Sequence, residues 1–209
     1  MNDPIVIDGF ISDELSLSFC DFLDPICRPS EQREGMRGAL GYKTSADAAE
    51  VGNTRRAING YENTEHEEIV LRIEQMYSAV RSALENHFGV AMDLVNCNYQ
   101  VLTEGAENPM HSDSTKLDGS PWRDDGIPEE LEYSALLYLN DYGKDYQGGE
   151  IYFPLQDVLI KPKTGQLLFF KGDVDHIHEV RKVLGGVRKN FVFFFSKRGN
   201  ISDQRFFND

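Results

Sequence analysis

Two short stretches that lie far apart in the chain carry side chains able to hold a metal ion. Met110-His111-Ser112-Asp113 places an imidazole and a carboxylate two residues apart, and His176-Ile177-His178-Glu179-Val180 supplies a further histidine. Two histidines and one carboxylate make up the facial triad, which binds Fe(II) on one side and leaves the opposite side open. The sequence therefore predicts a non-haem iron site with His111 and Asp113 among its ligands.

The third ligand is not decided by spacing. His176 and His178 are two residues apart and would point to the same face of a strand. His178 begins an alternating segment, whereas His176 lies in the turn Asp173-Val174-Asp175. Periodicity alone excludes neither histidine.

Arg188 follows His178 by ten positions and precedes the apolar run Phe191–Phe195. If it faces the interior of a barrel, it needs an anionic partner, because an unpaired buried guanidinium is strongly destabilising. A dicarboxylate cosubstrate would supply that partner with bidentate geometry. The alternative is an exposed arginine in a turn made by Gly185 and Gly186.

The second half of the chain must position these groups, and its pattern is that of short strands. Apolar or alternating runs are separated by Gly, Pro, Asn and Asp. The candidate strands are residues 94–103, 133–140, 149–153, 157–160, 166–171, 178–183 and 190–196. Many short strands with little helix between them predict an antiparallel barrel or jelly roll.

The first 90 residues are expected to begin with a short strand at 4–10 and to add two helices. Ser12 is a candidate N-cap before apolar residues that recur at helical spacing from Leu15 to Leu23. Thr64-Glu65-His66-Glu67 has the form of a capping box, and apolar residues then recur at helical spacing as far as Phe88. Gly89 suits a left-handed C-cap.

Between these helices, residues 28–56 have no regular pattern. This segment contains six basic and four acidic residues, a net charge of +2 in a chain of net charge -14. Such a segment is either a solvated surface loop or a lid whose arginines meet an anionic group of the substrate.

Composition limits the function classes. With 209 residues the chain fits one domain over 1–209, in which residues 1–90 form helical support with the lid loop and 91–198 form the catalytic core. The negative charge argues against nucleic acid as a partner. Cys20, Cys27 and Cys97 show no paired spacing, and neither a secretory leader nor a membrane-spanning apolar run is visible. We therefore expect a cytoplasmic protein without membrane contact; its oligomeric state is not indicated.

Together these motifs resemble the 2-oxoglutarate- and Fe(II)-dependent oxygenases, in particular the prolyl-hydroxylase branch. The similarity covers residues 95–198, and the motifs occur in the order of that family. They are His111-Ser112-Asp113, the strand Tyr133-Ser134-Ala135-Leu136-Leu137-Tyr138-Leu139-Asn140, Gly148-Gly149-Glu150, Lys161-Pro162-Lys163-Thr164-Gly165, Leu167-Leu168-Phe169-Phe170, and His178-Glu179-Val180 with Arg188.

The resemblance implies a mainly β fold with N-terminal helices and a double-stranded β-helix core, which is a cupin-like jelly roll. It implies three iron ligands, namely His111, Asp113 and His178. It also implies that Arg188 binds the distal carboxylate of 2-oxoglutarate, that Tyr138 hydrogen-bonds the same carboxylate, and that Tyr99 lies near the cosubstrate. Judged from sequence alone, Tyr138 could instead be a core aromatic residue.

The activity implied by the resemblance is hydroxylation of an unactivated C–H bond, with Fe(II), 2-oxoglutarate and O2 as cofactor and cosubstrates and ascorbate as a stimulant. Asp113 favours hydroxylation, since halogenases of this family replace that carboxylate. A prolyl residue in a protein or peptide is the leading substrate, and a free amino acid or other small metabolite is the alternative. An alternative of another class is a non-catalytic metal-binding β-barrel module. Residues 114–132 resemble an insertion of prolyl 3-hydroxylases, in which Trp122 would pack the loop or contact substrate.

Overall fold

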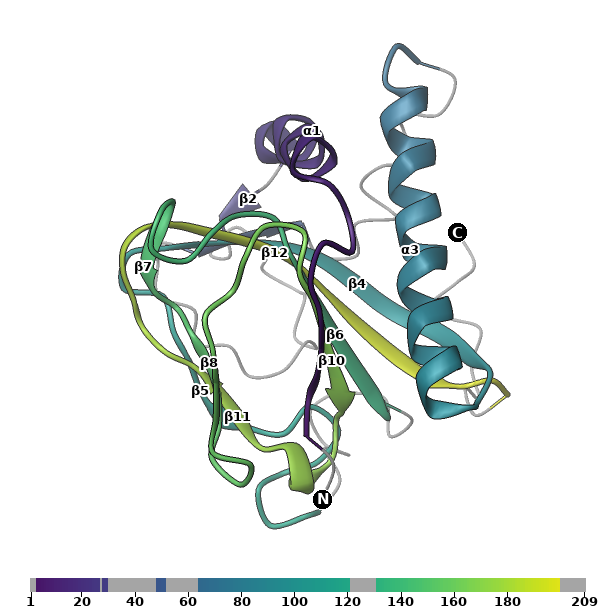
Figure 1. Cartoon of the computed structure of the whole chain (residues 1–209), viewed down its shortest axis with the longest axis vertical. Helices are drawn as coiled ribbons and strands as arrows, with labels where there is room; N and C mark the ends of the chain where they lie inside the picture. The colour runs from purple at the N-terminus through teal and green to yellow at the C-terminus, as the bar shows by residue number, and fades with distance from the viewer. Residues whose placement is uncertain (1–2, 27, 30–47, 52–63, 121–130, 200–209) are drawn as a thin grey trace.

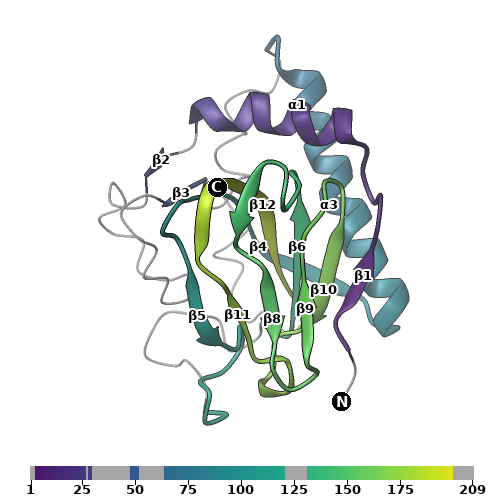
Figure 2. The same ribbon diagram turned by 60° about the vertical axis from the view of Figure 1, so that its left-hand side comes forward.

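The protein is built from two antiparallel sheets that face each other. The computed structural model describes residues 3–26, 28–29, 48–51, 64–120 and 131–199. Figure 1 shows the larger sheet with two helices against it, and Figure 2 shows the smaller sheet in front of the larger one. This arrangement confirms the predicted jelly-roll core.

The larger sheet contains eight strands. Seven run in the order β1-β10-β6-β12-β4-β3-β2, and β7 also pairs with β12. The strands are β1 (Ile5–Ile7), β2 (Arg28–Pro29), β3 (Ala48–Val51), β4 (Met92–Thr103), β6 (Tyr133–Tyr138), β7 (Tyr146–Gly148), β10 (Leu167–Lys171) and β12 (Val183–Lys197). Because β12 pairs with β4 on one side, from Val187 to Lys197, and with β6 on the other, from Asn190 to Phe195, it is the central strand of this sheet.

The smaller sheet has four strands in the order β5-β11-β8-β9. They are β5 (Asn108–His111), β8 (Ile151–Phe153), β9 (Val158–Ile160) and β11 (His178–Val180). In the pairing of β5 with β11, His178 lies opposite His111. This register brings together two residues that are 67 positions apart in the sequence.

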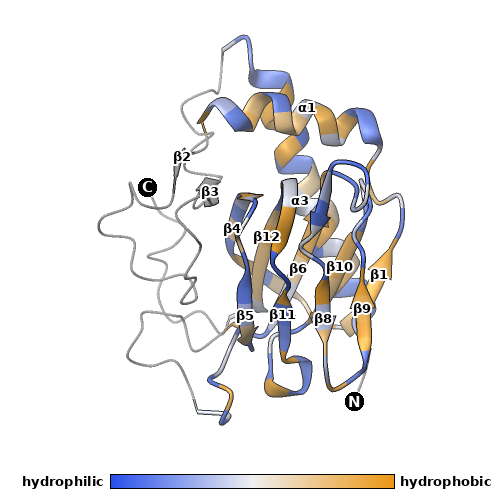
Figure 3. Cartoon of the chain, turned by 90° about the vertical axis from the view of Figure 1, so that its left-hand side faces the viewer, coloured by the Kyte–Doolittle hydropathy of each residue, from blue (hydrophilic) through white to orange (hydrophobic). Residues whose placement is uncertain are grey.

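Two helices, α1 (Asp13–Leu23) and α3 (Glu67–Phe88), cover the outer face of the larger sheet. Two short 3-10 segments, η1 (Asp24–Ile26) and η4 (Val174–His176), complete the described elements. Figure 3 shows that β1, β9 and β10 are mainly hydrophobic, whereas the loops at their ends are mainly hydrophilic.

Alternation along β12 divides its side chains between two cores. Phe191 and Phe193 pack beneath the helices, with Phe19 and Tyr77 against them. Val192 belongs to the second core, between the two sheets. Because alternate residues share a face, Asn190 and Arg188 also lie on the side of β12 that faces the smaller sheet.

The helix ends match the sequence prediction in two places and contradict it in one. Ser12 caps α1, since its hydroxyl oxygen accepts a hydrogen bond from the amide of Leu15 at 3.2 Å. Gly89 ends α3 with a φ of 69°. The predicted capping box is wrong, because the Thr64 hydroxyl accepts from the amide of His66 while α3 begins at Glu67 with no side-chain cap.

The strand prediction is wrong mainly at β5, β7 and β12. β5 and β7 were not predicted as strands, because β5 contains a proline and β7 a glycine, and both residues are disfavoured in strands. β12 begins at Val183, well before the predicted residue 190. The glycine pair Gly185-Gly186 therefore lies inside a strand rather than in a turn.

Some predictions fall outside the described residues. Most of the segment 28–56 and Trp122 with its neighbours are among them, so the lid and the role of the insertion stay predictions. Within the described ranges, neither α1 nor α3 combines the length and the apolar character needed to cross a membrane.

The packing of α3 on the sheet is testable through Ile73, which is fully buried in the helix-side core. Replacing it with alanine should lower the free energy of unfolding by about 2–5 kcal/mol, because the lost contacts leave a cavity. Leu71→Ala is the control on the same helix, since Leu71 is 56% exposed. Urea unfolding of both variants checks this, and equal midpoints would contradict the packing described.

Candidate metal and cosubstrate site

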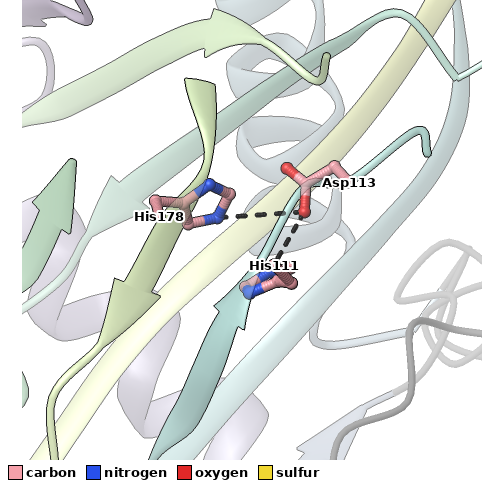
Figure 4. Close-up of side chains that lie close together, drawn as sticks. All are labelled: His111, Asp113 and His178. Carbon is pink, nitrogen blue, oxygen red and sulfur yellow. Dashed lines mark ion pairs between the residues drawn. The ribbon is translucent and has the colours of Figure 1, made fainter. Parts of the chain in front are cut away.

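Three side chains converge between the sheets on the side of β5 and β11. His111 ends β5, Asp113 follows it by two residues, and His178 begins β11. One potential ligand atom from each lies within 4.8 Å of the others. The Asp113 Oδ1 atom is 3.3 Å from His111 Nε2 and 3.9 Å from His178 Nε2 (Figure 4). The three predicted metal ligands thus form one cluster.

Each histidine of the cluster has its Nδ1 atom next to a backbone carbonyl. His111 Nδ1 is 2.8 Å from the Pro109 oxygen, and His178 Nδ1 is 2.9 Å from the His176 oxygen. A carbonyl oxygen can only accept, so each Nδ1 carries a hydrogen, and in the neutral ring each Nε2 offers its lone pair to the cluster. This second contact of the ring fixes its orientation, as is usual for metal-bound histidines.

Electrostatics favours a bound cation at this cluster. Burial acts to raise the pKa of Asp113, but the His178 and His111 imidazoles outweigh it and lower that pKa. Burial lowers the pKa of His178 to about 4, against the opposing charge of Asp113. Although burial opposes it, hydrogen bonding to Asp113 raises the pKa of His111. A buried carboxylate with two adjacent imidazoles is therefore a place where positive charge is stabilised.

The structure separates the two histidines that spacing left open. The His176 ring lies in η4, stacks on Phe170 at a centroid distance of 6.3 Å, and has its Nδ1 atom 2.7 Å from Asp173 Oδ1. It contributes no atom to the described metal-type cluster. Its backbone carbonyl instead orients His178.

Asp113 lies beyond the end of β5, so its position depends on the following loop rather than on strand alternation. The Ser112 hydroxyl donates to the Thr115 carbonyl at 2.9 Å. The amide and the hydroxyl of Ser114 both donate to the Gly172 carbonyl, at 2.9 and 2.8 Å. A Cβ on Gly172 would lie 3.3 Å from Asp113 Cβ, so a small residue allows this close contact. The loop is therefore attached to the residue after β10 through Ser114, directly after the carboxylate, and Ser112 holds the turn within the loop.

Arg188 lies between the sheets and is only 1% exposed, which excludes the alternative of an exposed turn arginine. Its Nη1 atom donates to Asn190 Oδ1 at 2.8 Å, and Asn190 Nδ2 donates to Gln100 Oε1 at 3.3 Å. Its carbon Cζ is 5.2 Å from the centroid of the Tyr138 ring. The hydrogen-bonded chain from Gln100 through Asn190 fixes one edge of the guanidinium.

The other edge of the guanidinium makes no hydrogen bond within the part of the chain that the structure describes. Among the described residues, Arg188 Nε and Nη2 and the hydroxyl of Tyr138 are buried without a hydrogen bond. Such groups are destabilising unless a ligand or water pairs with them. Two N–H groups on one edge of a guanidinium match the two oxygens of a carboxylate. These residues therefore present donors suited to a carboxylate, and binding of the cosubstrate by Arg188 and Tyr138 stays a prediction.

One cavity connects the two groups of residues. His111, Asp113 and His178 line it together with Arg188. A molecule in this cavity can thus contact the metal ligands and the guanidinium at the same time.

The prediction for Tyr99 is wrong. Its side chain belongs to the helix-side core and its hydroxyl donates to Asp24 Oδ1, on the opposite face of the sheet from the cavity. Its neighbour Gln100 lines the cavity instead. A shift of one residue along a strand reverses the face, and this is the reason for the error.

Sequence reasoning also missed Asn190 and Gln100. Both are buried, and they connect β4 to the guanidinium of Arg188. Asn190 could have been found, because it is the next residue on the same strand face as Arg188 and is a polar residue in an apolar run. Gln100 could not, since its contact depends on the pairing of β4 with β12.

Comparison with known proteins agrees with this geometry. A family model described as "2OG-Fe(II) oxygenase superfamily" matches residues 97–196. Human prolyl 3-hydroxylase 3 is 30% identical over 164 residues, which cover 75% of this chain and 20% of that protein. The chain therefore spans about a fifth of the length of this relative.

Solved structures show the same fold at lower identity. A Pseudomonas putida prolyl-4-hydroxylase has a TM-score of 0.57 and 22% identity, and the match covers 94% of this chain and 93% of that one. A Trichoplax adhaerens prolyl hydroxylase, in complex with a hypoxia inducible factor oxygen degradation domain peptide fragment, has a TM-score of 0.59 and 17% identity over 98% and 89% of the two chains. With a His-Asp-His cluster and a buried arginine in one jelly-roll cavity, and with the matching family model, the chain belongs to the 2OG-Fe(II) oxygenase superfamily.

Proposed function

We propose that the chain is an Fe(II)- and 2-oxoglutarate-dependent dioxygenase that hydroxylates an unactivated C–H bond, most favourably of a prolyl residue in a protein or peptide. The observation that carries this proposal is that the three ligand atoms and the half-paired guanidinium of Arg188 open into one cavity. A metal site without Arg188 would fit a storage module equally well. The additional carboxylate pocket favours an enzyme over a non-catalytic barrel.

The residues of the cluster would hold the metal through two imidazole nitrogens and one carboxylate, which leaves further positions open to cosubstrate and O2. Fe(II) in such a site supplies the oxidation, in which 2-oxoglutarate and O2 give succinate and CO2 while a C–H group becomes an alcohol. The protein orients the ligands through the Pro109 and His176 carbonyls. Ascorbate, which would keep the iron reduced, is proposed as a stimulant.

Arg188 and Tyr138 would bind the far carboxylate of the cosubstrate and so set the distance of its oxo end from the metal ligands. Asn190 is a positioning residue, because it holds the guanidinium edge that does not face the carboxylate. Burial raises the pKa of Tyr138, although the Arg188 charge opposes this, so its hydroxyl is a hydrogen-bond donor at neutral pH.

The prolyl substrate is supported by the relatives, whose names describe prolyl hydroxylases and, in one structure, a bound peptide fragment. Met110, next to His111 in β5, is 42% exposed and offers an apolar contact near the site. A free amino acid is the second candidate, because Glu107 lines the same cavity and its carboxylate, which lies 3.8 Å from the Lys182 ammonium, would also attract the ammonium group of a substrate.

Substrate class can be decided by mass spectrometry. The enzyme is incubated with Fe(II), 2-oxoglutarate and ascorbate, with proline-rich peptides in one arm and free amino acids in the other. We expect a hydroxylated product, heavier by one oxygen atom, in the peptide arm. A product only in the amino-acid arm would replace the leading substrate by the second candidate.

The metal ligands are tested by comparing His178→Ala with His176→Ala. Replacing a residue that only hydrogen-bonds a metal ligand typically lowers metal affinity or activity by about 10–100-fold. Because His178 is itself a proposed ligand, its replacement should reduce Fe(II)-dependent succinate formation by about 100-fold or more. His176→Ala should keep most of the activity, because its contribution to the site is a backbone carbonyl. Normal turnover by the His178 variant would contradict the assignment.

The carboxylate pocket is tested by Gly149→Ala. Gly149 has a φ of 68°, and a Cβ there would lie 3.0 Å from Arg188 Cδ, so the guanidinium must shift. We expect the dissociation constant for 2-oxoglutarate, measured with Mn(II)-loaded protein, to rise about tenfold, equivalent to loss of one hydrogen bond to a charged group.

Gly143→Ala is the matched control for this change. It has a φ of 83° and no atom within 4 Å of the added Cβ, so it carries the same backbone strain without the contact. Equal affinities of the two variants for 2-oxoglutarate would show that Gly149 does not make room for Arg188.

A further inference from the structure

A second tyrosine hydroxyl lies buried beside Arg188, and the sequence motifs did not indicate it. Tyr146 is the first residue of β7 and is 2% exposed. Its hydroxyl has no hydrogen-bond partner among the described residues, as is also true of Tyr138. After burial, the strongest influences on its ionisation are the charge of Arg188 and the phenol of Tyr138, and the Arg188 side chain also interacts with the hydroxyl, so the three groups lie close together.

The pairing of β7 with β12 brings Tyr146 to this position. Tyr146 lies opposite Gly186, where a Cβ would come within 2.7 Å of Tyr146 Cα. A Cβ on Gly149 would lie 3.0 Å from Arg188 Cδ and 3.4 Å from Tyr146 Cε2. The tyrosine ring and the arginine side chain therefore pack on the same glycine.

The hydroxyl contributes nothing to packing that a phenylalanine would not provide. Its ring already contacts Tyr142 edge-on at a centroid distance of 6.1 Å. Burying a hydroxyl without a partner is destabilising. A ligand that accepts a hydrogen bond at this place would remove that cost.

We propose that Tyr146 is a third donor to the distal carboxylate of 2-oxoglutarate, alongside Arg188 and Tyr138; this inference rests on the proposed function. A carboxylate offers about four lone-pair sites. The Nε and Nη2 edge of Arg188 can fill two of them, and the two tyrosine hydroxyls can fill the others. Burial raises the pKa of Tyr146, so the hydroxyl keeps its proton at neutral pH and acts as a donor.

The test uses direct binding to the Mn(II)-loaded protein, without turnover. The ligands are 2-oxoglutarate and 2-oxopentanoate, in which a methyl group replaces the distal carboxylate. Tyr146→Phe should weaken 2-oxoglutarate binding about tenfold, because one hydrogen bond to a charged group is lost. Its affinity for 2-oxopentanoate should equal that of the wild type.

Stability of the protein without 2-oxoglutarate is a second readout. Tyr146→Phe removes an unpaired buried hydroxyl, so its melting temperature should equal or exceed that of the wild type. The increase in melting temperature on adding 2-oxoglutarate should be smaller for the variant. Tyr142→Phe is the matched control, since Tyr142 packs against Tyr146 but its hydroxyl interacts with Glu150. This control should bind both ligands as the wild type does.

The outcomes separate the two proposals. One outcome overturns the role of Tyr146 while the proposed function stands. In it, the wild type binds 2-oxoglutarate, Arg188→Met does not, and Tyr146→Phe binds as tightly as the wild type. If the wild type fails to bind 2-oxoglutarate, the proposed function and this inference are both overturned. An equal loss of affinity for both ligands in Tyr146→Phe would show a general packing effect and would also overturn the role of Tyr146.

Discussion

The burial of one half-paired guanidinium is the constraint on which the site depends. Arg188 lies in the centre of a β-sandwich, where a charge is stable only if it is paired. The protein provides one partner in Asn190, an aromatic face in Tyr138 and space at Gly149. The remaining edge is complementary to a carboxylate, so binding of an anion completes the interior of the fold.

The metal cluster follows from a second constraint, the register of the smaller sheet. Opposed residues on β5 and β11 place His111 and His178 side by side, with ring centroids 4.3 Å apart. Backbone carbonyls hold both rings with Nε2 facing Asp113. Because these contacts are made by the main chain, the orientation of both rings is built into the strand ends, and the Asn108 amide contacts His111 Nε2 at 3.1 Å as well.

The helix side of the larger sheet keeps the central strand in place. Lys189, between Arg188 and Asn190 on β12, points to the opposite face, where its ammonium donates to Asp24. The Tyr99 hydroxyl donates to the other oxygen of the same carboxylate. The residue predicted to bind cosubstrate therefore has a structural role, since it attaches η1 to the sheet behind the pocket.

The sequence by itself determined the types of the candidate metal ligands, the two helices and most of the strands, because these depend on local spacing and alternation, whereas the burial of Arg188 was decided by the structure. It left His176 and His178 open and placed Tyr99 on the wrong face, because neighbouring residues on a strand differ only in the face they occupy. Only the tertiary structure decided these points, and only it placed Gln100 and Tyr146 near Arg188. Both reach that place through the pairing of β12 with β4 and β7, and the partners of a strand are set by packing of the whole chain rather than by its own residues.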